Sequence, residues 1–590
     1  MIKKYFLIFM ALSFAQEGIN FTYESKYGDG TNVDDNTNQE ALYKYFENLL
    51  DINFNYNNLF FYTQLEYSNS PIYGIDRIKI EDLANTYFAE YSRGSLMAKY
   101  GHIQTLYGYG LAINMFQDQT TDFDNRVKGW ELRYSPYDMI DLFLISGKGN
   151  YGAKSNGGLR INDLLFDHEL DLLGTQLYTS LGDISLIYSK KTTHYSSGIY
   201  NSLINSDTRL SIDLQDYWLS NLGEAWDSLS LLDSEVALNS FNIGYSNTLG
   251  NFDIYLEYDM IKYNKILRNE DIDGNSKFVS VATNFKGVDF LYEFKDYDMV
   301  YYMPITSNPP LVFNETSSVL ISRNQHSIDF SDEIGHQFES RFNYKDISFL
   351  MNLSIGRKHG GVRNSNDFEF DEDFNLIYGT YQEPTFSDLL DMDFLDEDLR
   401  AHKPFRDFYI EASGFTNAND KEYLNSLISL TNDLVMPDYY KVGLHSHYSY
   451  DNASGKNYQS ISIPMQLVYT LENNNSWTIY YEQQWTDNLF MIGDTYDNDS
   501  FYYDYMSLSY HIDGFGSISY FRDDEKKTFS YCIESQDSWE GVELTYELSS
   551  SMQYSIFMGS QKGGLVCANG ICAVQPSFED GVKVTFRALF

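Results

Sequence analysis

The sequence predicts an all-β protein: a single large antiparallel transmembrane β-barrel of about 24 strands (about 22–26), with short periplasmic turns and long acidic outer loops. Three observations predict it. Apolar and polar residues alternate along most of the chain, short and long connections alternate, and the chain ends in an amphipathic strand. No stretch approaches the roughly 20 apolar residues that a membrane-spanning helix needs.

The composition restricts the class of protein before any motif is considered. The chain of 590 residues has 84 acidic and 41 basic side chains and a formal net charge of −43, which excludes attraction to nucleic-acid phosphates. Aromatic residues make up 17% of the chain; this excludes a disordered chain and fits the aromatic girdles of membrane barrels. We therefore expect a folded membrane protein with no nucleic-acid partner.

The N-terminus predicts export. Two lysines precede a short apolar stretch over residues 5–14, and Ser13 and Ala15 are small residues before a cleavage site. We expect residues 1–15 to be a cleaved signal peptide and residues 16–590 to be one outer-membrane β-barrel. The predicted location is the outer membrane of a Gram-negative-type bacterium, where the lipid bilayer and outer-membrane lipids surround the protein.

Alternation with a period of two defines the strands. Residues 252–258 and 542–548 are apolar at every second position and mostly polar between. Successive side chains of a strand point to opposite faces, so each segment has one apolar face for lipid and one polar face for the lumen. The candidate lumen-facing residues are Asp253, Glu257, Glu543, Glu547, Lys583 and Arg587.

The connections alternate in length. Short turns such as 57–58 and 286–287 alternate with long polar stretches such as 27–40, 103–126 and 359–404. A sandwich or a propeller has no reason to place a long loop at every second connection, whereas outer-membrane barrels do.

The last strand is the most specific signal. Its apolar face consists of Val582, Val584, Phe586, Ala588 and Phe590. This pattern is typical of the terminal strand that the barrel-assembly machinery reads. We expect it to pair with the first strand, because closure satisfies the backbone hydrogen bonds in lipid.

Two regions carry a resemblance to a known family. Residues 101–149 contain Gly108, Tyr109, Gly110, Asp118, Asn125, Gly129 and Pro136. Residues 563–572 read Gly-Gly-x-Val-Cys-x-x-Gly-x-Cys, followed by Pro576 and Gly581, and Phe405-Arg406-Asp407 is a third point. In these residues the chain resembles an uncharacterised family of signal-peptide-bearing outer-membrane β-barrel proteins. The resemblance implies the fold and no activity.

Two cysteines close to the C-terminus flank a turn. Cys567 and Cys572 enclose Asn569-Gly570, the preferred pair of a type I′ turn. They should face each other at a non-hydrogen-bonded pair, about 4.5 Å apart between Cα atoms. In an exported protein we expect a disulfide that rigidifies the tip of the last outer loop, with free thiols or a metal as alternatives. Cys532 remains unpaired as a buried thiol.

An acidic segment, residues 367–398, has 12 carboxylates and no Lys or Arg, with Phe and Leu interleaved. It is either an exposed loop, a pore-lining constriction that favours cations, or a site for divalent cations or a basic partner. An open barrel of this size would breach the permeability barrier, and the strand pattern begins at residue 19 with no plug before it. We therefore expect long loops, 365–400 among them, to fold inward, or a plug or surface partner protein to bind.

Three classes of function follow. The favoured one is porin-like passive or ligand-selective transport through a lumen constricted by inward-folded acidic loops. The alternative is a non-transport role as an outer-membrane scaffold, adhesin or secretion-complex component. A third, an outer-membrane lipid hydrolase, rests on His194 and Ser196, which would share a strand face as base and nucleophile.

No catalytic constellation is complete in the sequence. No residue that would orient His194 can be identified, and His445 and His447 are explained by a polar barrel wall. We expect no enzyme, no catalytic residues, no cofactor and no metal. The substrate cannot be deduced from the sequence.

Overall fold

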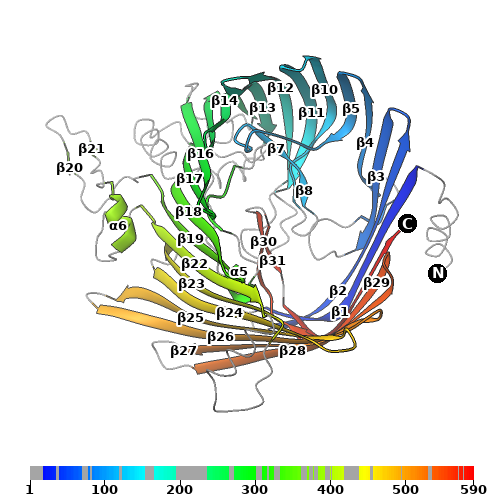
Figure 1. Cartoon of the computed structure of the whole chain (residues 1–590), viewed down its shortest axis with the longest axis vertical. Helices are drawn as coiled ribbons and strands as arrows, with labels where there is room; N and C mark the ends of the chain where they lie inside the picture. The colour runs from blue at the N-terminus through cyan, green and yellow to red at the C-terminus, as the bar shows by residue number, and fades with distance from the viewer. Residues whose placement is uncertain are drawn as a thin grey trace, which may run out of the picture.

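The strands of the computed structural model form one closed ring (Figure 1). Within it, 24 strands form a single antiparallel sheet in which sequence neighbours pair, so the predicted fold is confirmed. The structure describes residues 18–34, 39–69, 77–79, 83–118, 123–152, 165–194, 235–264, 272–299, 309–314, 318–323, 332–359, 369–370, 376–377, 383–391, 399, 402–416, 437–451, 456–492, 495–528, 534–568, 571–575 and 577–590.

The first half of the barrel comprises β1 (Ile19–Asp34), β2 (Gln39–Tyr56), β3 (Leu59–Asn69), β4 (Ala84–Arg93), β5 (Leu96–Ile103), β10 (Val127–Tyr137), β11 (Ile140–Gly152), β12 (Leu165–Thr179), β13 (Gly182–His194), β14 (Glu235–Leu249), β15 (Phe252–Asn264) and β16 (Ile272–Phe285). The second half comprises β17 (Val288–Asp298), β18 (Asp332–Tyr344), β19 (Ile347–Arg357), β22 (Phe405–Phe415), β23 (Tyr439–Asp451), β24 (Lys456–Thr470), β25 (Ser476–Ile492), β26 (Thr495–Ile512), β27 (Gly516–Thr528), β28 (Glu534–Ser549), β29 (Met552–Gln561) and β32 (Phe578–Leu589).

The barrel closes because β1 pairs with β32. Tyr23 lies opposite Ala588, and the backbones of Phe21 and Phe590 exchange hydrogen bonds of 3.0 and 2.8 Å. Closure removes the two free edges that would leave N–H and C=O groups unpaired in lipid. The predicted pairing of the terminal strand with the first strand is confirmed.

The tight turns lie at the end of the barrel where β1 begins and β32 ends. At Lys286 and Gly287 both φ angles are positive, 54° and 84°, as a type I′ turn requires. The longest connections lie at the opposite end, but the predicted alternation has exceptions at both ends. At the turn end, β22 ends at Phe415 and β23 begins only at Tyr439. At the opposite end, β25 ends at Ile492 and β26 begins at Thr495, and the connections from β23 to β24 and from β27 to β28 are also short. The expected loop 27–40 is wrong because β1 and β2 extend to Asp34 and from Gln39.

The outer face of the barrel is apolar. Large exposed side chains on this face include Trp130, Leu132, Tyr134, Leu142, Leu173, Phe241, Ile243, Leu256, Phe290, Val442, Leu444, Ile461, Ile463, Trp485, Val542, Leu544 and Val582. A contiguous apolar surface of this extent fits lipid and not water. Among the described residues no helix is long and apolar enough to cross a membrane.

The remaining elements belong to the long connections. They are β6 (Thr105–Tyr107), β7 (Ile113–Met115), β8 (Gln117–Asp118), β9 (Phe123–Asp124), α5 (Val319–Arg323), β20 (Glu369–Phe370), β21 (Leu376–Ile377), α6 (Phe386–Asp391), β30 (Gly564–Ala568) and β31 (Ile571–Gln575). Figure 1 shows β7, β8, α5, β30 and β31 inside the ring of strands, and α6 outside it.

Candidate functional site: the lumen and the segments folded into it

The inner wall of the barrel has two chemically different parts. On β11–β13 the buried inward side chains include the apolar residues Phe143, Ile145, Leu170, Leu172 and Ile187. On β17–β27 they are largely polar, and include Lys295, Glu333, Gln337, Asn352, Asp407, His445, Glu482, Gln484, Asp523 and Glu525. The expectation of a polar inner face throughout is therefore wrong for β11–β13, where another part of the chain covers the apolar side chains.

Residues 105–115 cover this apolar wall. β6 and β7 pair as a hairpin, and Ile113 and Met115 are buried in one cluster with the wall. The ring of Tyr107 stacks on Phe143, with centroids 3.7 Å apart and planes 6° from parallel. Each fully buried Ile or Met side chain contributes about 2 kcal/mol. Hydrophobic packing therefore fixes this hairpin to the wall.

One buried carboxylate holds the tip of the hairpin. Glu257 is 3% exposed and accepts a hydrogen bond of 2.8 Å from the backbone N–H of Tyr109. It also accepts bonds from the Tyr255 hydroxyl (2.7 Å) and the Asn242 amide (3.0 Å). Gly108 has a φ of +66°, and a Cβ there would lie 2.7 Å from Glu257 Oε2. A side chain at Gly108 would push the hairpin off the wall.

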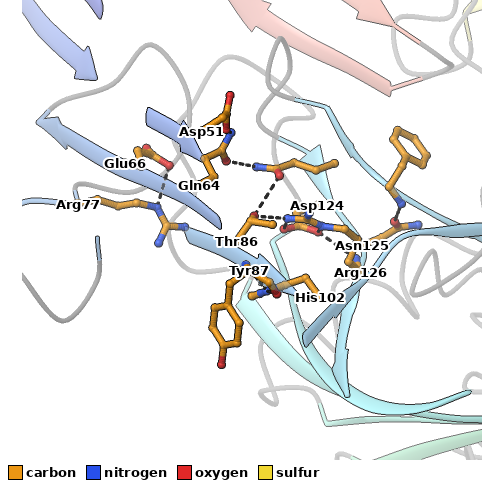
Figure 2. A network of polar contacts seen from close by, with 12 residues as sticks. Asp51, Gln64, Glu66, Arg77, Thr86, Tyr87, His102, Asp124, Asn125 and Arg126 are labelled. Carbon is orange, nitrogen blue, oxygen red and sulfur yellow. Dashed lines mark hydrogen bonds and ion pairs between the residues drawn. The ribbon is translucent and has the colours of Figure 1, made fainter. Parts of the chain in front are cut away.

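A polar network ties the other end of this segment to β3 and β4 (Figure 2). Arg126 pairs with Asp124 at 2.8 Å and donates to the Thr86 hydroxyl at 2.7 Å. Thr86 donates to Gln117 at 3.2 Å, and Gln117 donates to Gln64 at 3.4 Å. The bond from Arg126 to Thr86 is buried, since Arg126 is 6% and Thr86 0% exposed, and the network holds the second end of the segment.

Asn125 braces the same segment internally (Figure 2). Its Oδ1 accepts a bond of 2.8 Å from the N–H of Phe116, and its Nδ2 donates at 2.8 Å to the carbonyl of Asn114. A fully buried side chain that must both accept and donate is suited to an amide and not to a carboxylate. This gives a physical reason for the asparagine that contributes to the family resemblance.

Residues 309–314 are tied to the inner wall of β17. The Lys295 ammonium, 0% exposed, lies 2.6 Å from Glu333 and donates to the carbonyl of Leu311 at 2.6 Å. The Tyr297 hydroxyl donates to the carbonyl of Pro310 at 2.7 Å. A buried charge needs such partners, since an unpaired one would be strongly destabilising.

The same connection is also tied to β25 and β27. Glu482 on β25, 0% exposed, accepts bonds of 2.9 and 3.1 Å from the N–H groups of Leu320 and Ile321 in α5. Arg323 pairs with Asp523 on β27 at 2.6 Å. Between β17 and β18 the chain therefore places α5 inside the ring, against β25 and β27, as Figure 1 shows.

The connection between β29 and β32 also lies in the lumen. β30 contacts α5, and both lie inside the ring (Figure 1). The Lys562 ammonium lies 2.9 Å from Glu525, and 4.5 and 5.3 Å from the ring centroids of Tyr503 and Trp539. The expectation that this hairpin forms the tip of an outer loop is wrong, because its contacts with α5 and the inner wall draw it into the barrel.

The backbone of β30 and β31 pairs Cys567 with Cys572, next to the Ala568 and Ile571 pair. This register is the one that the Asn-Gly turn predicts. The side chains of both cysteines, like Cys532, lie outside the described residues, so the disulfide remains a prediction.

The acidic segment 365–400 does not constrict the lumen in its described part, residues 369–370, 376–377, 383–391 and 399, since Figure 1 shows β20, β21 and α6 outside the ring. Phe386 of α6 packs against Phe338, with ring centroids 6.2 Å apart, and Leu389 packs against Ile355. Phe338 lies on the outer face of β18, since its neighbours Gln337 and Glu339 face inward and it is 40% exposed. The expectation of an inward-folded acidic loop is wrong for these residues, because Phe386 and Leu389 find apolar partners on the outer face.

Two histidines of the inner wall share one carboxylate. Asp407 Oδ2 lies 2.7 Å from His445 Nε2 and 3.1 Å from His447 Nδ1, and all three side chains are buried. The pair shares a strand face, and Asp407, on the neighbouring strand β22, explains its position in the wall.

The candidate lumen-facing residues fall on the inner face by register. Glu257 and Asp253 are on one face of β15, and Glu257 contacts the inward hairpin. Glu543 and Glu547 lie on β28 and share a face with Trp539, whose ring contacts Lys562 in the lumen. Lys583 lies 4.4 Å from the ring centroid of Phe578, and Arg587 shares its face. Sequence reasoning missed Asp523 and Glu525, since their partners are distant in the chain.

The terminal strand presents its apolar face outward. Phe586 lies 4.5 Å from Tyr554 and 6.0 Å from Tyr23, measured between ring centroids. Val582 is 38% exposed and Ala588 is covered by its neighbours. The role of this strand in assembly remains a prediction. Residues 1–17 and Ser196 lie outside the described residues, so neither the signal peptide nor the His194–Ser196 pair is placed.

The geometry defines a class of protein: a closed β-barrel with an apolar exterior and a lumen narrowed by its own connections. Within this class, the chain belongs to DUF6029, a family of unknown function, whose model matches residues 3–590. No curated protein matches the chain.

Solved structures with a similar arrangement of strands include three outer-membrane proteins. The P pilus usher (PapC) translocation pore is 9% identical, with 97% of this chain and 99% of that chain covered and a TM-score of 0.37. The siderophore receptor PirA from Pseudomonas aeruginosa is 6% identical, with coverage of 98% and 80% and a TM-score of 0.40. The outer membrane protein OprD from Pseudomonas aeruginosa is 10% identical, with coverage of 74% and 90% and a TM-score of 0.33. Similarity at this level carries no functional argument.

Proposed function

We propose that this barrel lets small solutes cross the outer membrane passively, cations in preference to anions, through a lumen narrowed by residues 105–126, 309–323 and 562–575. The observation that carries the proposal is the polar inner wall of β17–β27. It holds the buried carboxylates Glu333, Glu339, Asp407, Glu482, Asp523 and Glu525. Four of the six pair with a cation of the chain, Lys295, Arg341, Arg323 or Lys562. The acidic excess that remains on this wall attracts cations and repels anions along a narrow, low-dielectric path.

The placement in the outer membrane rests on the apolar exterior and the closed ring of strands. A polar inner wall inside an apolar exterior is the arrangement of a barrel that holds water within lipid. The proposal includes a cleaved signal peptide over residues 1–15, insertion by the barrel-assembly machinery, and the turn end of the barrel on the periplasmic side. The proposal also includes the binding of divalent cations by the outer acidic loops.

A non-transport role is the second candidate, and the filled lumen favours it. Three separate segments occupy the interior, and one of them is fixed by hydrophobic packing against the wall. A scaffold, adhesin or secretion-complex component needs no continuous path for solutes. We propose no enzymatic activity; lipid hydrolysis that depends on Ser196 would contradict this.

The experiment is the reversal potential of the purified, refolded protein in a planar bilayer with a salt gradient across it. Transport predicts stable conductance steps and a reversal potential of the sign that cation selectivity gives. A folded barrel that conducts no ions would exclude the transport proposal and favour the second candidate. Anion selectivity would contradict the role given to the carboxylates.

A further inference from the structure

Two kinds of attachment hold the inward segments. Residues 105–115 are packed into an apolar cluster with the wall, which cannot open without exposing buried hydrocarbon to water. The segment 318–323 also buries Leu320 and Ile321 and bonds to Glu482 on β25, but its ion pair, like that of Lys562 before the β30–β31 hairpin, is made with one strand, β27. A charged solute can replace the Lys or Arg side chain of an ion pair, whereas a water-soluble solute cannot replace a packed apolar side chain.

Asp523 and Glu525 are the two ties on β27. Residues two apart on a strand share a face, so Asp523 and Glu525 both point into the lumen. Each of the two carboxylates pairs with a cation from a different inward segment. Arg323 comes from α5 and pairs with Asp523 at 2.6 Å. Lys562 comes from the connection after β29 and pairs with Glu525 at 2.9 Å, whose other oxygen lies 3.2 Å from Lys527 of β27 itself. The side chains of the two acidic residues are only 7% and 5% exposed.

The surroundings of Lys562 are those of an ammonium-binding cage. Its Nζ lies over the rings of Tyr503 and Trp539, at 4.5 and 5.3 Å from their centroids, and Glu525 supplies the carboxylate. Aromatic faces and a carboxylate together recognise organic cations, because the ring faces carry partial negative charge. Part of the chain itself occupies this cage.

The tie between Arg323 and Asp523 uses only part of its capacity. Among the residues that the structure describes, Asp523 Oδ1 and Arg323 Nη1 are buried without a hydrogen-bond partner. A guanidinium and a carboxylate bind most strongly through two parallel hydrogen bonds. A free guanidinium can adopt that bidentate geometry, whereas Arg323, constrained by α5, makes one contact of 2.6 Å.

We propose that Asp523, Glu525, Tyr503 and Trp539 form a recognition site for guanidinium and primary ammonium groups, which Arg323 and Lys562 occupy when the lumen is closed. A solute that carries such a group competes for the site and releases α5 and the β30–β31 hairpin. This inference rests on the proposed function and names its preferred solutes and its gate. The hairpin at residues 105–115 stays in place.

The test is hydrogen exchange of the refolded full chain in detergent, read by mass spectrometry on peptides that contain Leu320 and Ile321. Their N–H groups bond to Glu482 in the closed state. The probe is methylguanidinium chloride, and the control is methylurea, its neutral analogue, at equal ionic strength. The net contribution of one hydrogen-bonded contact corresponds to about fivefold in an equilibrium, so we expect about fivefold faster exchange with methylguanidinium only.

Variants locate the effect. Asp523→Asn combined with Glu525→Gln should raise the basal exchange and abolish the response to methylguanidinium. Glu547→Gln on the neighbouring strand, a carboxylate for which no contact with the inward segments is described, should leave both unchanged. Peptides from β27 and β28 report whether the barrel itself remains folded. n-Butylammonium should act through the Lys562 cage in the same way.

The outcomes separate this inference from the proposed function. Equal exchange in methylguanidinium and methylurea would overturn the site, even if the barrel conducts cations. The wild-type comparison needs no variant, so a variant that fails to fold does not remove the test. A specific response to methylguanidinium in a barrel that conducts no ions would support the site and reject transport.

Discussion

Replacement of Glu257 should detach the tip of the hairpin that covers the apolar wall. In Glu257→Ala, the Tyr109 N–H, the Tyr255 hydroxyl and the Asn242 amide all lose their acceptor. A buried donor left without a partner costs about 1–3 kcal/mol. Three such losses, partly relieved by water, destabilise the closed tip by about 3 kcal/mol.

Glu257→Gln is the matched control. The Gln carbonyl can accept the bonds from Tyr109 and Tyr255, and its NH₂ group can donate to Asn242, whose Oδ1 is buried without a partner among the described residues. This variant should therefore keep the tip closed.

Hydrogen exchange at Tyr109 measures the opening directly. A loss of about 3 kcal/mol corresponds to about 100-fold faster exchange through local opening in Glu257→Ala. Glu257→Gln should stay within a few-fold of wild type. If both variants exchange at the wild-type rate, the carboxylate does not hold the tip and the reasoning is refuted.

Three further predictions follow from single sites. Burial opposes protonation of His359, but the hydrogen bonds that its ring donates to two aspartates outweigh burial and raise its pKa from 6.5 to about 9. The protonated ring therefore stabilises the fold by about 3 kcal/mol; this stabilisation is complete below pH 6.5 and is lost as the pH rises through about 9. His359→Gln should lower the melting temperature at pH 6 and not at pH 10. Gly129→Ala places a Cβ 2.0 Å from the carbonyl oxygen of Ser146, so the yield of refolded, heat-modifiable barrel should collapse, whereas Gly94→Ala, which meets nothing within 4 Å, should refold. Non-reducing mass spectrometry should find the Cys567–Cys572 peptide two hydrogens lighter than its reduced form; a free dithiol would contradict the disulfide.

The strands were predictable because alternation is a local property. The alternation in residues 252–258 and 542–548 predicts which side chains share a face, and the structure has strands β15 and β28 there. The terminal strand is equally local, and its closure against β1 follows from the need to satisfy backbone groups in lipid. Predictions that depend on neighbouring residues therefore succeeded.

The direction in which a loop folds was not predictable from its charge. Residues 365–400 are acidic, which suggested a pore lining, but Phe386 and Leu389 required apolar partners and found them on the outer face. The sequence of β12 did contain a usable pattern, because it places leucines on both faces of the strand: Leu170 and Leu172 on the inner face and Leu173 on the outer face. An apolar inner face indicates that something covers it.

The contacts between the inward segments and the barrel wall cannot be predicted from neighbouring residues in the sequence. Arg323 and Asp523 are 200 residues apart, and nothing near either residue in the sequence indicates the other. By contrast, Gly108 and Asn125 could be singled out from their pattern, and the structure supplies the reason in the close approach to Glu257 and the brace across Asn114 and Phe116.

The central claim is that the chain's own inward segments, and not the acidic loop, narrow the lumen. The measurement is single-channel conductance of two deletion variants beside wild type, one with residues 562–577 and one with residues 365–400 replaced by a short Gly-Ser linker. Removal of 562–577 should raise the conductance, because it removes the β30–β31 hairpin and the Lys562 tie. Removal of 365–400 should leave it unchanged. The reverse result, a larger conductance only when 365–400 is removed, would contradict the account.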